Sequence, residues 1–311
     1  MRALVTGGAG FIGSHLVDAL LAEGHEVVVL DNFATGRREN LPDAAKLLEG
    51  DVADADAVAQ AVAGCEVVFH QAALGSVARS VARPLDTDRS NIHGALAVLS
   101  AAQQAGVRRV VLASSSSVYG GAAQVPTSED VPLCPRSPYA VTKLADEHYA
   151  RVFWELHALE TVCLRYFNVF GPRQRPDSEY AAVIPRFVHA LVDGTSPEVH
   201  GDGQQSRDFT FVADAVQANL RAADAAPAYC AGKAYNVARG QPHSLLELLE
   251  ILSGQIGSTV QPHHIASRPG DVRHSHADIA AARRDLRYEP QVSFSEGLAR
   301  TVGWFRSRQS T

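Results

Sequence analysis

Lysine, methionine and long apolar segments are scarce in this chain of 311 residues. Only three of its 28 basic residues are lysines (Lys46, Lys143 and Lys233), and its single methionine is Met1. Arginine keeps its charge in any environment, whereas lysine changes its pKa readily and takes part in chemistry. A lysine inside a chemical motif of this chain is therefore informative. No apolar run approaches the roughly 18 residues of a membrane span, so we expect no membrane partner.

Strong charge and cysteine motifs are missing as well. The formal net charge of −6, without a basic block, argues against nucleic acid as a partner. The four cysteines lie far apart and form no CxxC, so neither a zinc site nor a disulfide framework is indicated. The N-terminus has neither the apolar stretch nor the cleavage site of a signal peptide. We therefore expect a cytoplasmic protein.

The first half of the chain alternates short apolar runs with amphipathic segments. Strands are predicted at residues 2–6, 26–30, 66–70 and 108–113. Helices are predicted at residues 11–23 and 91–105. Strands that are continuous Val and Leu runs are typical of a parallel sheet covered by helices on both faces. The pattern predicts an α/β fold of the Rossmann type, with a doubly wound parallel sheet.

After about residue 168 the chain becomes more irregular, and no repeat or polar linker is present. Further helices are predicted at residues 182–193, 213–225, 245–254 and 296–308. We expect a dinucleotide-binding domain at residues 1–168, which takes back roughly residues 208–232. A smaller α/β substrate domain is expected at residues 169–311.

A glycine-rich turn, TGGAGFIG, follows the first predicted strand and opens the first helix. Its small residues let the backbone approach a pyrophosphate, and the helix N-terminus supplies free N–H groups. Asp31 ends the next strand, where a carboxylate accepts hydrogen bonds from ribose hydroxyls and repels a 2′-phosphate. We predict dinucleotide binding, with NAD favoured over NADP. Packing glycines and a plain turn acid are the alternatives, and the nearby Arg37 and Arg38 leave NADP open.

Tyr139 and Lys143 form a YxxxK motif directly after a Ser-Pro helix start. On a helix the two side chains lie one turn apart, and an ammonium near a tyrosine hydroxyl favours the phenolate, a general base. The serines at 114–117 follow a predicted strand, at the edge where open α/β sheets bind ligands. No GxSxG is present to suggest a serine hydrolase. An exposed helix pair and an ordinary serine-rich loop are the alternatives.

Together these motifs resemble the extended short-chain dehydrogenase/reductases, and among them the nucleotide-sugar 4-epimerases. The resemblance covers essentially the whole chain through TGGAGFIGSHL, LDNFATG, VFHQAAL, SSSSVYG, SPYAVTK, LRYFNVFGPRQ, GDGQQSRDFTFV and RPGDVRHSHAD. It implies an NAD-dependent isomerase of carbohydrate metabolism, with NAD on the first domain and a UDP-sugar on the second. It also implies that Ser115 completes a catalytic Ser-Tyr-Lys triad with Tyr139 and Lys143.

The same resemblance implies two sets of binding residues. The cofactor set is Gly7, Gly10, Phe11, Ile12, Gly13, Asp31, Asn32, Gly36, Asp51, Val52, Gln71, Ala72, Ala73, Asn91, Tyr139, Lys143 and Tyr166. The substrate set is Gly75, Ser76, Ser115, Ser116, Tyr139, Asn168, Gln174, Val183, Arg207, Arg268, Asp271 and Ser275. Arg207 and Arg268 suit a diphosphate, because guanidinium groups bind phosphate oxygens in pairs. Each arginine alone is more often a surface charge.

The residues after Ser115 bear on the reaction. Related sugar 4,6-dehydratases carry an Asp-Glu pair where this chain has Ser116 and Ser117, and UDP-glucuronate decarboxylases also need a Glu there. The resemblance therefore implies reversible oxidation at C4 through a 4-keto intermediate, with Tyr139 accepting the hydroxyl proton. A dehydratase or net oxidoreductase, and a non-catalytic NAD-binding regulator, are the alternatives.

Substrate preference depends on few positions. In the family that this chain resembles, the residue at Ser275 gates the sugar pocket, and a small residue there leaves room for an N-acetyl group. UDP-GlcNAc and UDP-GalNAc are therefore favoured. UDP-glucose and UDP-galactose are alternatives, and so are UDP-glucuronate and UDP-galacturonate, because Arg173 and Arg175 could attract a carboxylate.

Two further expectations concern metals and assembly. His263, His264, His274 and His276 lie in predicted loops without a nearby carboxylate arrangement, so no metal site is expected. The helices predicted at residues 91–105 and 138–156 resemble those that form a four-helix dimer bundle in relatives. We therefore expect a homodimer.

Overall fold

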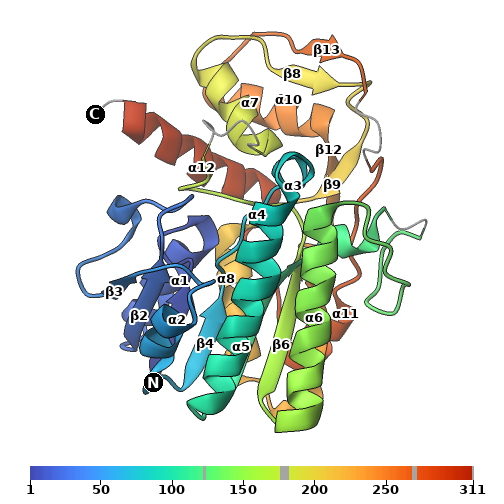
Figure 1. Ribbon diagram of the computed structural model, residues 1–311. Helices are drawn as coiled ribbons and strands as arrows, with labels where there is room; N and C mark the ends of the chain where they lie inside the picture. The colour runs from blue at the N-terminus through green and yellow to red at the C-terminus, as the bar shows by residue number, and fades with distance from the viewer. Residues whose placement is uncertain (122–123, 176–181, 268–271, 310–311) are drawn as a thin grey trace.

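A seven-stranded parallel sheet forms the centre of the structure (Figure 1). The computed structural model describes residues 1–121, 124–175, 182–267 and 272–309. The strands lie in the order β11–β6–β5–β4–β1–β2–β3, and all neighbours are parallel. Their bounds are β1 (Arg2–Thr6), β2 (Glu26–Asp31), β3 (Lys46–Glu49), β4 (Val67–His70), β5 (Arg109–Ser115), β6 (Glu160–Tyr166) and β11 (Lys233–Val237). The Rossmann-type α/β fold is confirmed, and its chain order reverses between β1 and β4, where such folds bind ligands.

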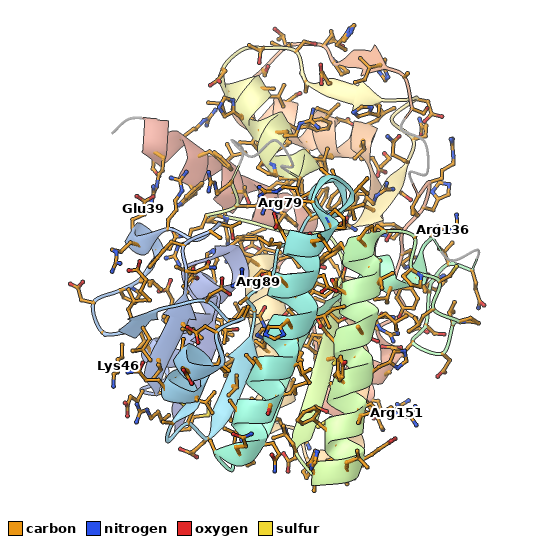
Figure 2. All side chains as sticks on the ribbon, viewed as in Figure 1. Glu39, Lys46, Arg79, Arg89, Arg136 and Arg151 are labelled. Atoms are coloured by element: carbon orange, nitrogen blue, oxygen red, sulfur yellow. The ribbon has the colours of Figure 1, made fainter. Side chains whose placement is uncertain are left out.

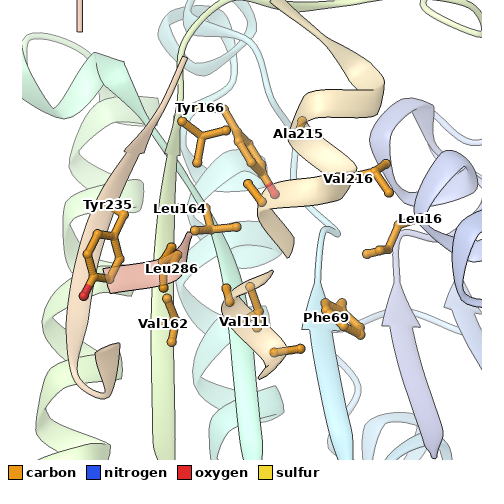
Figure 3. Packing of buried hydrophobic residues seen from close by; sticks show 14 of the residues in the cluster. Leu16, Phe69, Val111, Val162, Leu164, Tyr166, Ala215, Val216, Tyr235 and Leu286 are labelled. Atoms are coloured by element: carbon orange, nitrogen blue, oxygen red, sulfur yellow. The ribbon is translucent and has the colours of Figure 1, made fainter. Parts of the chain in front are cut away.

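Helices cover both faces of this sheet because its strands are apolar on both sides. Neighbouring residues such as Val67 and Val68 belong to two different buried clusters. One face carries α2 (Ala55–Val62), α5 (Gly94–Gln104) and α6 (Pro138–His157). The other face carries α1 (Phe11–Ala22), α8 (Val212–Asp224) and α11 (Ala280–Leu286). Figure 3 shows Leu16 and Val216 of this second face packed toward Phe69 and Val111 of the sheet.

A separate buried cluster lies above the carboxyl ends of the strands, and we call the part of the chain around it the small lobe (Figure 1). Its helices are α7 (Val183–Val192), α10 (Leu245–Ile256) and α12 (Phe294–Gln309). Its strands pair as β7 (Val169–Phe170) with β10 (Thr210–Phe211), β8 (Glu198–His200) with β13 (His263–Ile265), and β9 (Ser206–Asp208) with β12 (Pro242–Ser244). Between β10 and β12 the chain returns to the central sheet through α8 and β11, and it comes back to the small lobe with β12. The predicted domain boundary at residue 168 stays a prediction.

Short helices complete the fold between these elements. They are η1 (Arg38–Asn40), α3 (Val77–Ala82), α4 (Pro84–Asp88), the π-helix η2 (Arg89–His93), η3 (Ser116–Tyr119) and α9 (Pro227–Cys230). In the described ranges, none of the helices has both the length and the apolar character that crossing a membrane requires.

The turn between β1 and α1 packs backbone against backbone. Gly7 has φ +68°, and a Cβ there would lie 2.7 Å from the backbone of Ala72. A Cβ on Gly13 would lie 2.2 Å from the carbonyl oxygen of Gly7. Neither backbone neighbour can move aside as a flexible side chain could. These glycines therefore let α1 begin directly at the carboxyl end of β1.

We expect Gly13→Ala to lower the thermal unfolding midpoint, because the added methyl group overpacks the turn at a cost of about 1–3 kcal/mol. Gly303→Ala is the matched control, because a Cβ there meets nothing within 4 Å in α12. Removing glycine from a helix interior stabilises by roughly 0.5–1 kcal/mol, so the control raises the midpoint. Thermal unfolding followed by circular dichroism measures both, and equal midpoints for the two variants would contradict the close packing.

Candidate active site

A cleft of about 1710 Å³ lies between the carboxyl ends of the central strands and the small lobe. Residues from both halves of the chain line it, among them Gly7, Ser115, Tyr139 and Arg207. Parallel strands all end at the same edge of a sheet, so residues far apart in sequence meet there. The cleft therefore joins the glycine-rich turn to the YxxxK motif.

The structure brings most of the predicted site residues to this cleft. Of the cofactor set, all line the cleft except Gly36 and Asn91. All described members of the substrate set line it, whereas Arg268 and Asp271 lie outside the described residues. Gly36 packs behind the cleft, where a Cβ would lie 2.9 Å from Ala9. The individual roles of these residues stay predictions.

The N-terminus of α1 opens onto the cleft without a cap. The N-cap residue, Gly10, makes no side-chain capping hydrogen bond, and no acidic residue lies in the first turn. The free N–H groups and the positive end of the helix dipole therefore face the space beside Gly10 and Phe11. This environment fits the diphosphate of a dinucleotide.

Asp31 lies at the end of β2, beside this turn. Its Oδ2 accepts a hydrogen bond from the Ala9 N–H at 2.9 Å, and its Oδ1 accepts one from the Phe33 N–H at 2.8 Å. Burial raises the pKa of the carboxyl, although both backbone hydrogen bonds oppose the rise. Each oxygen keeps a lone pair for a further donor, so the carboxylate fits ribose hydroxyls.

Three side chains close the cleft floor in a ring of hydrogen bonds. The Tyr166 hydroxyl donates to Gln71 Oε1 at 3.2 Å, and Gln71 Nε2 donates to Asn219 Oδ1 at 3.0 Å. Asn219 Nδ2 in turn donates to the Tyr166 hydroxyl at 2.7 Å. Burial raises the pKa of Tyr166 to about 12, so its hydroxyl stays protonated at neutral pH. The ring fixes Gln71, which lines the cleft at the end of β4.

Asn91 supports the cleft wall from behind. This buried residue of the π-helix accepts a hydrogen bond at Oδ1 from the Leu74 N–H, at 2.9 Å. Its Nδ2 donates to Thr142 Oγ1 at 3.0 Å, and the Thr142 hydroxyl donates to the Tyr139 carbonyl at 2.8 Å. The side-chain amide of Asn91 thus links Leu74, in the cleft wall, to α6, the helix that carries Tyr139.

Ser115 ends β5 with its hydroxyl inside the cleft. Its Oγ accepts hydrogen bonds from the Ser117 N–H at 3.1 Å and from the Ser117 hydroxyl at 2.9 Å. With both acceptor positions occupied, the hydrogen of Ser115 remains to be donated. The geometry suits a hydroxyl that donates to a substrate oxygen.

Tyr139 and Lys143 occupy successive turns of α6, and both line the cleft. Tyr139 is half-buried, whereas Lys143 is buried. The Lys143 ammonium donates to Asp146 Oδ2 at 3.0 Å, and the Asp146 carboxylate is also buried. The YxxxK motif thus continues into a third ionisable residue on the same helix.

A buried ion pair holds α6 against β6 behind the serines. Arg165 donates from Nε and Nη2 to the two carboxylate oxygens of Glu147, at 2.9 and 2.8 Å. Glu147 also accepts the Ser114 hydroxyl at 2.5 Å, and Arg165 Nη1 donates to the Tyr119 hydroxyl at 2.8 Å. Bidentate pairs of this kind fix orientation as well as distance. The network therefore fixes α6 relative to β5.

At the small-lobe end, Arg207 and Asn168 are held by backbone carbonyls. Arg207 Nη1 donates to the Ser206 carbonyl at 2.9 Å, and Asn168 Nδ2 donates to the Asp208 carbonyl at 3.3 Å. Both side chains line the cleft. A guanidinium group next to an amide suits the oxygens of a diphosphate.

Gln174 presents an acceptor at the same end. Its Nε2 donates to the Val169 carbonyl at 3.1 Å, whereas its Oε1 is buried and has no hydrogen-bond partner among the described residues. A buried acceptor without a partner is costly. A ligand with an N–H group would therefore satisfy it.

Sequence reasoning missed Asp146, Asn219 and the pair of Glu147 with Arg165. The i,i+3 spacing of Lys143 and Asp146 is a visible sequence signal for Asp146. No local spacing indicates that Arg165 of β6 pairs with Glu147, or that Asn219 of α8 contacts Tyr166. Further arginines were also not anticipated in the cleft wall. Arg79, Arg89 and Arg136, which are labelled in Figure 2, all line the cleft.

Of the four histidines considered as metal ligands, His263 and His264 lie in β13 and not in a loop as predicted. His274 Nδ1 is hydrogen-bonded to Ser206 Oγ at 2.9 Å, and His264 Nδ1 to the Gly201 carbonyl at 2.7 Å. Within the described ranges, no three His, Cys, Asp or Glu side chains cluster as a metal site requires.

Comparisons with known proteins agree with this geometry. The model of the family described as "NAD dependent epimerase/dehydratase family" matches residues 3–238. The UDP-glucose 4-epimerase of Mycolicibacterium smegmatis is 43% identical, over 99% of both chains. The structure of UDP-N-acetylglucosamine 4-epimerase from Methanobrevibacter ruminantium is 40% identical with a TM-score of 0.94, covering 99% of this chain and 98% of that one.

A third relative was solved with the cofactor. The UDP-glucose 4-epimerase of Thermus thermophilus, in complex with NAD, is 36% identical with a TM-score of 0.89, covering 98% of this chain and 99% of that one. Its cofactor agrees with the uncapped helix and the acid of this cleft. The chain thus belongs to the NAD-dependent epimerase/dehydratase family, as an NAD-dependent epimerase.

Proposed function

We propose that this enzyme interconverts the C4 epimers of UDP-hexoses, with UDP-GlcNAc and UDP-GalNAc as its preferred pair. The observation that carries the proposal is that one cleft contains the glycine-rich turn, Ser115, Tyr139 and Lys143. A C4 epimerase needs its base and its cofactor at the same carbon, and these residues converge from separate strands and α6. The resemblance of M. smegmatis and M. ruminantium epimerases over the whole chain supports the reaction class.

In this proposal the chain's own residues move the C4 proton. Tyr139, as a phenolate stabilised by Lys143, accepts the proton of the C4 hydroxyl, and Ser115 donates a hydrogen bond to the same oxygen. Bound NAD, held by the turn of Gly7–Gly13 and by Asp31, supplies reversible hydride transfer. Arg207 holds the diphosphate while the sugar turns. A firmly held nucleotide and a loosely held sugar allow reduction from either face.

The serines after Ser115 favour epimerisation over elimination. Ser117 donates to Ser115, and Ser116 lines the cleft. Neither hydroxyl provides the carboxylate that the resemblance associates with dehydratases and decarboxylases. A 4-keto sugar formed in this cleft therefore has no neighbouring acid at these two positions to promote loss of water.

Two observations support the N-acetylated substrates. Gln174 Oε1 is a buried acceptor without a described partner, and an acetamido N–H is a matching donor. Ser275 lines the cleft with a small side chain that leaves room for the acetyl group. UDP-glucuronate is the second candidate, because Arg173 lines the cleft and its Nη1 is a buried donor with no hydrogen-bond partner among the described residues, whereas its Nη2 pairs with Asp18 at 2.7 Å.

The proposed reaction predicts that UDP-GlcNAc is converted to UDP-GalNAc with the highest kcat/KM of a panel containing UDP-glucose and UDP-glucuronate. Proton NMR of the anomeric region identifies each C4 epimer without a coupling enzyme. Absence of an epimer from every substrate overturns the proposed function, and a higher value for UDP-glucuronate overturns the preference.

The matched control for this panel is Tyr139→Phe, which removes the base and retains the ring. We expect kcat to fall by at least about 10²-fold while NAD binding persists, because general base catalysis contributes about that much. Tyr229→Phe changes an exposed tyrosine of α9 and should leave kcat unchanged.

Ser275→Tyr tests the assignment of this residue to the sugar pocket. The bulky ring should lower kcat/KM for UDP-GlcNAc by about 10- to 100-fold relative to UDP-glucose, since only the former needs space for an acetyl group. Ser275→Ala keeps the space and should preserve the ratio. If the ratio of kcat/KM for UDP-GlcNAc to that for UDP-glucose is unchanged in Ser275→Tyr, the acetyl group binds elsewhere.

We further propose that the enzyme is a homodimer formed through α5 and α6. Val141, Tyr149, Val152 and Leu156 are exposed apolar residues at helical spacing, which gives α6 an outer apolar stripe. Such a stripe is suited to an interface with a second copy, because a two-fold contact uses the same surface twice. Figure 1 shows α5 and α6 side by side on the sheet.

Sedimentation velocity at micromolar concentration should therefore give a dimer, and Leu156→Glu should give a monomer, because a buried unpaired charge is unfavourable at an apolar interface. Tyr229→Ser, an exposed position on α9, is the control that keeps the dimer. A monomeric wild-type protein contradicts the proposed interface.

A further inference from the structure

Tyr139, Lys143 and Asp146 form a series along one face of α6. The residues are spaced four and three apart, so all three side chains lie on the same side of the helix. Lys143 lies between the phenol and the carboxylate in this order. Its ammonium donates to Asp146 Oδ2 at 3.0 Å, and both side chains are almost entirely inaccessible to solvent, at 2% and 1% exposure. The positive charge of Lys143 therefore acts both on Tyr139, the proposed base, and on Asp146, which takes no direct part in the reaction.

Asp146 has little reason to be buried apart from Lys143. Its other oxygen, Oδ1, is buried and has no hydrogen-bond partner in the described part of the chain. An under-satisfied buried carboxylate is costly to the fold. Burial also raises the pKa of Asp146, to about 6, despite the opposing effect of Lys143.

The pKa of Lys143 is raised as well, but here the attraction to its partner prevails over burial. Burial alone disfavours the ammonium, but attraction to Asp146, with a smaller contribution from Tyr139, outweighs it, and the pKa of Lys143 lies above its ordinary value. A buried lysine without a counter-charge tends to lose its proton. Asp146 is therefore the group that keeps Lys143 charged inside the protein.

The other ionisable groups around the pair do not replace this charge. His70 of β4 is neutral, because burial lowers its pKa to about 3, with a smaller effect of Lys143. Cys163 of β6 stays a thiol, because burial raises its pKa well above the usual value. Glu147 and Arg165 neutralise each other through their bidentate pair. Asp146 is the remaining carboxylate beside Lys143 among these groups.

We propose that Asp146 is a positioning residue for proton transfer, which holds the Lys143 ammonium charged and in place behind Tyr139. It touches neither of the reacting atoms and acts only through Lys143. Its negative charge also offsets part of the lysine's electrostatic effect on Tyr139. The catalytic part of this inference rests on the proposed function, in which Tyr139 is the base.

The scarcity of lysine permits a test that needs no activity. A protein labelled with 13C at the lysine Cε has three signals, and Lys46→Arg and Lys233→Arg assign the two lysines outside the cleft. We expect the Lys143 signal to titrate above the two others, whose reference pKa is about 10.4. If Lys143 of the wild-type enzyme titrates at or below the pH of the other two lysines, Asp146 does not keep it charged. That result overturns the proposed role of Asp146 whether or not the proposed substrate is correct.

The second measurement compares pH–rate profiles of the holoenzyme with those of Asp146→Asn. Loss of the counter-charge removes the attraction that keeps the buried Lys143 protonated. Lys143 then loses its proton more easily, so an alkaline limb should appear below the pH at which that of the wild type begins. Asp146→Glu keeps the charge and should move the alkaline limb back toward that of the wild type.

Glu155→Gln is the matched control, because it removes a carboxylate from the exposed pair with Arg151 on the same helix. Its pH–rate profile should coincide with that of the wild type. An Asp146→Asn profile that also coincides, with only stability or the maximal rate reduced, means that Asp146 is structural and overturns the proposal. If the asparagine variant does not fold, the wild-type lysine titration decides.

Discussion

The site depends on one constraint, the in-register parallel pairing of the central strands. Thr6 of β1 pairs with His70 of β4, and Ser115 of β5 pairs with Tyr166 of β6. The Thr6 hydroxyl is hydrogen-bonded to His70 Nδ1 at 2.8 Å, which joins the ends of two strands at the edge where the cleft begins. Parallel strands end together, so the residue after each strand reaches the same space. Without this alignment the glycine-rich turn and the serines would not share a cleft.

Behind that edge, buried polar networks determine orientation. The pair of Arg165 and Glu147 fixes α6 on β6, and Asn91 ties the same helix to the cleft wall. Removing one partner of such a buried pair leaves an uncompensated charge, which is why networks of this kind act as units. Tyr139 thus has its position set by contacts on the side of α6 that faces the protein. Its side chain lines the cleft.

Sequence patterns predicted the long elements better than the short ones. The apolar runs of β1, β2, β4 and β5 were evident because strands buried on both faces need them. The helix predicted at residues 91–105 starts within a π-helix at Arg89–His93, and α5 follows it. The spacing of apolar residues does not distinguish a π-helix from a regular helix. The short α2 was missed, although Asp54 caps it by accepting the N–H groups of Asp56 and Ala57.

What the sequence determined by itself is local: a glycine turn next to a strand, an acid at the end of the next, and Tyr139 one turn from Lys143. These depend on short spacings, and short spacings fix geometry along one helix or turn. Tertiary structure alone decided which distant groups surround them. Asn219 closes the ring with Tyr166, Arg165 neutralises Glu147, and burial leaves Gln174 Oε1 without a partner among the described residues. Burial, which changes the charge and reactivity of such groups, exists only once the chain has folded.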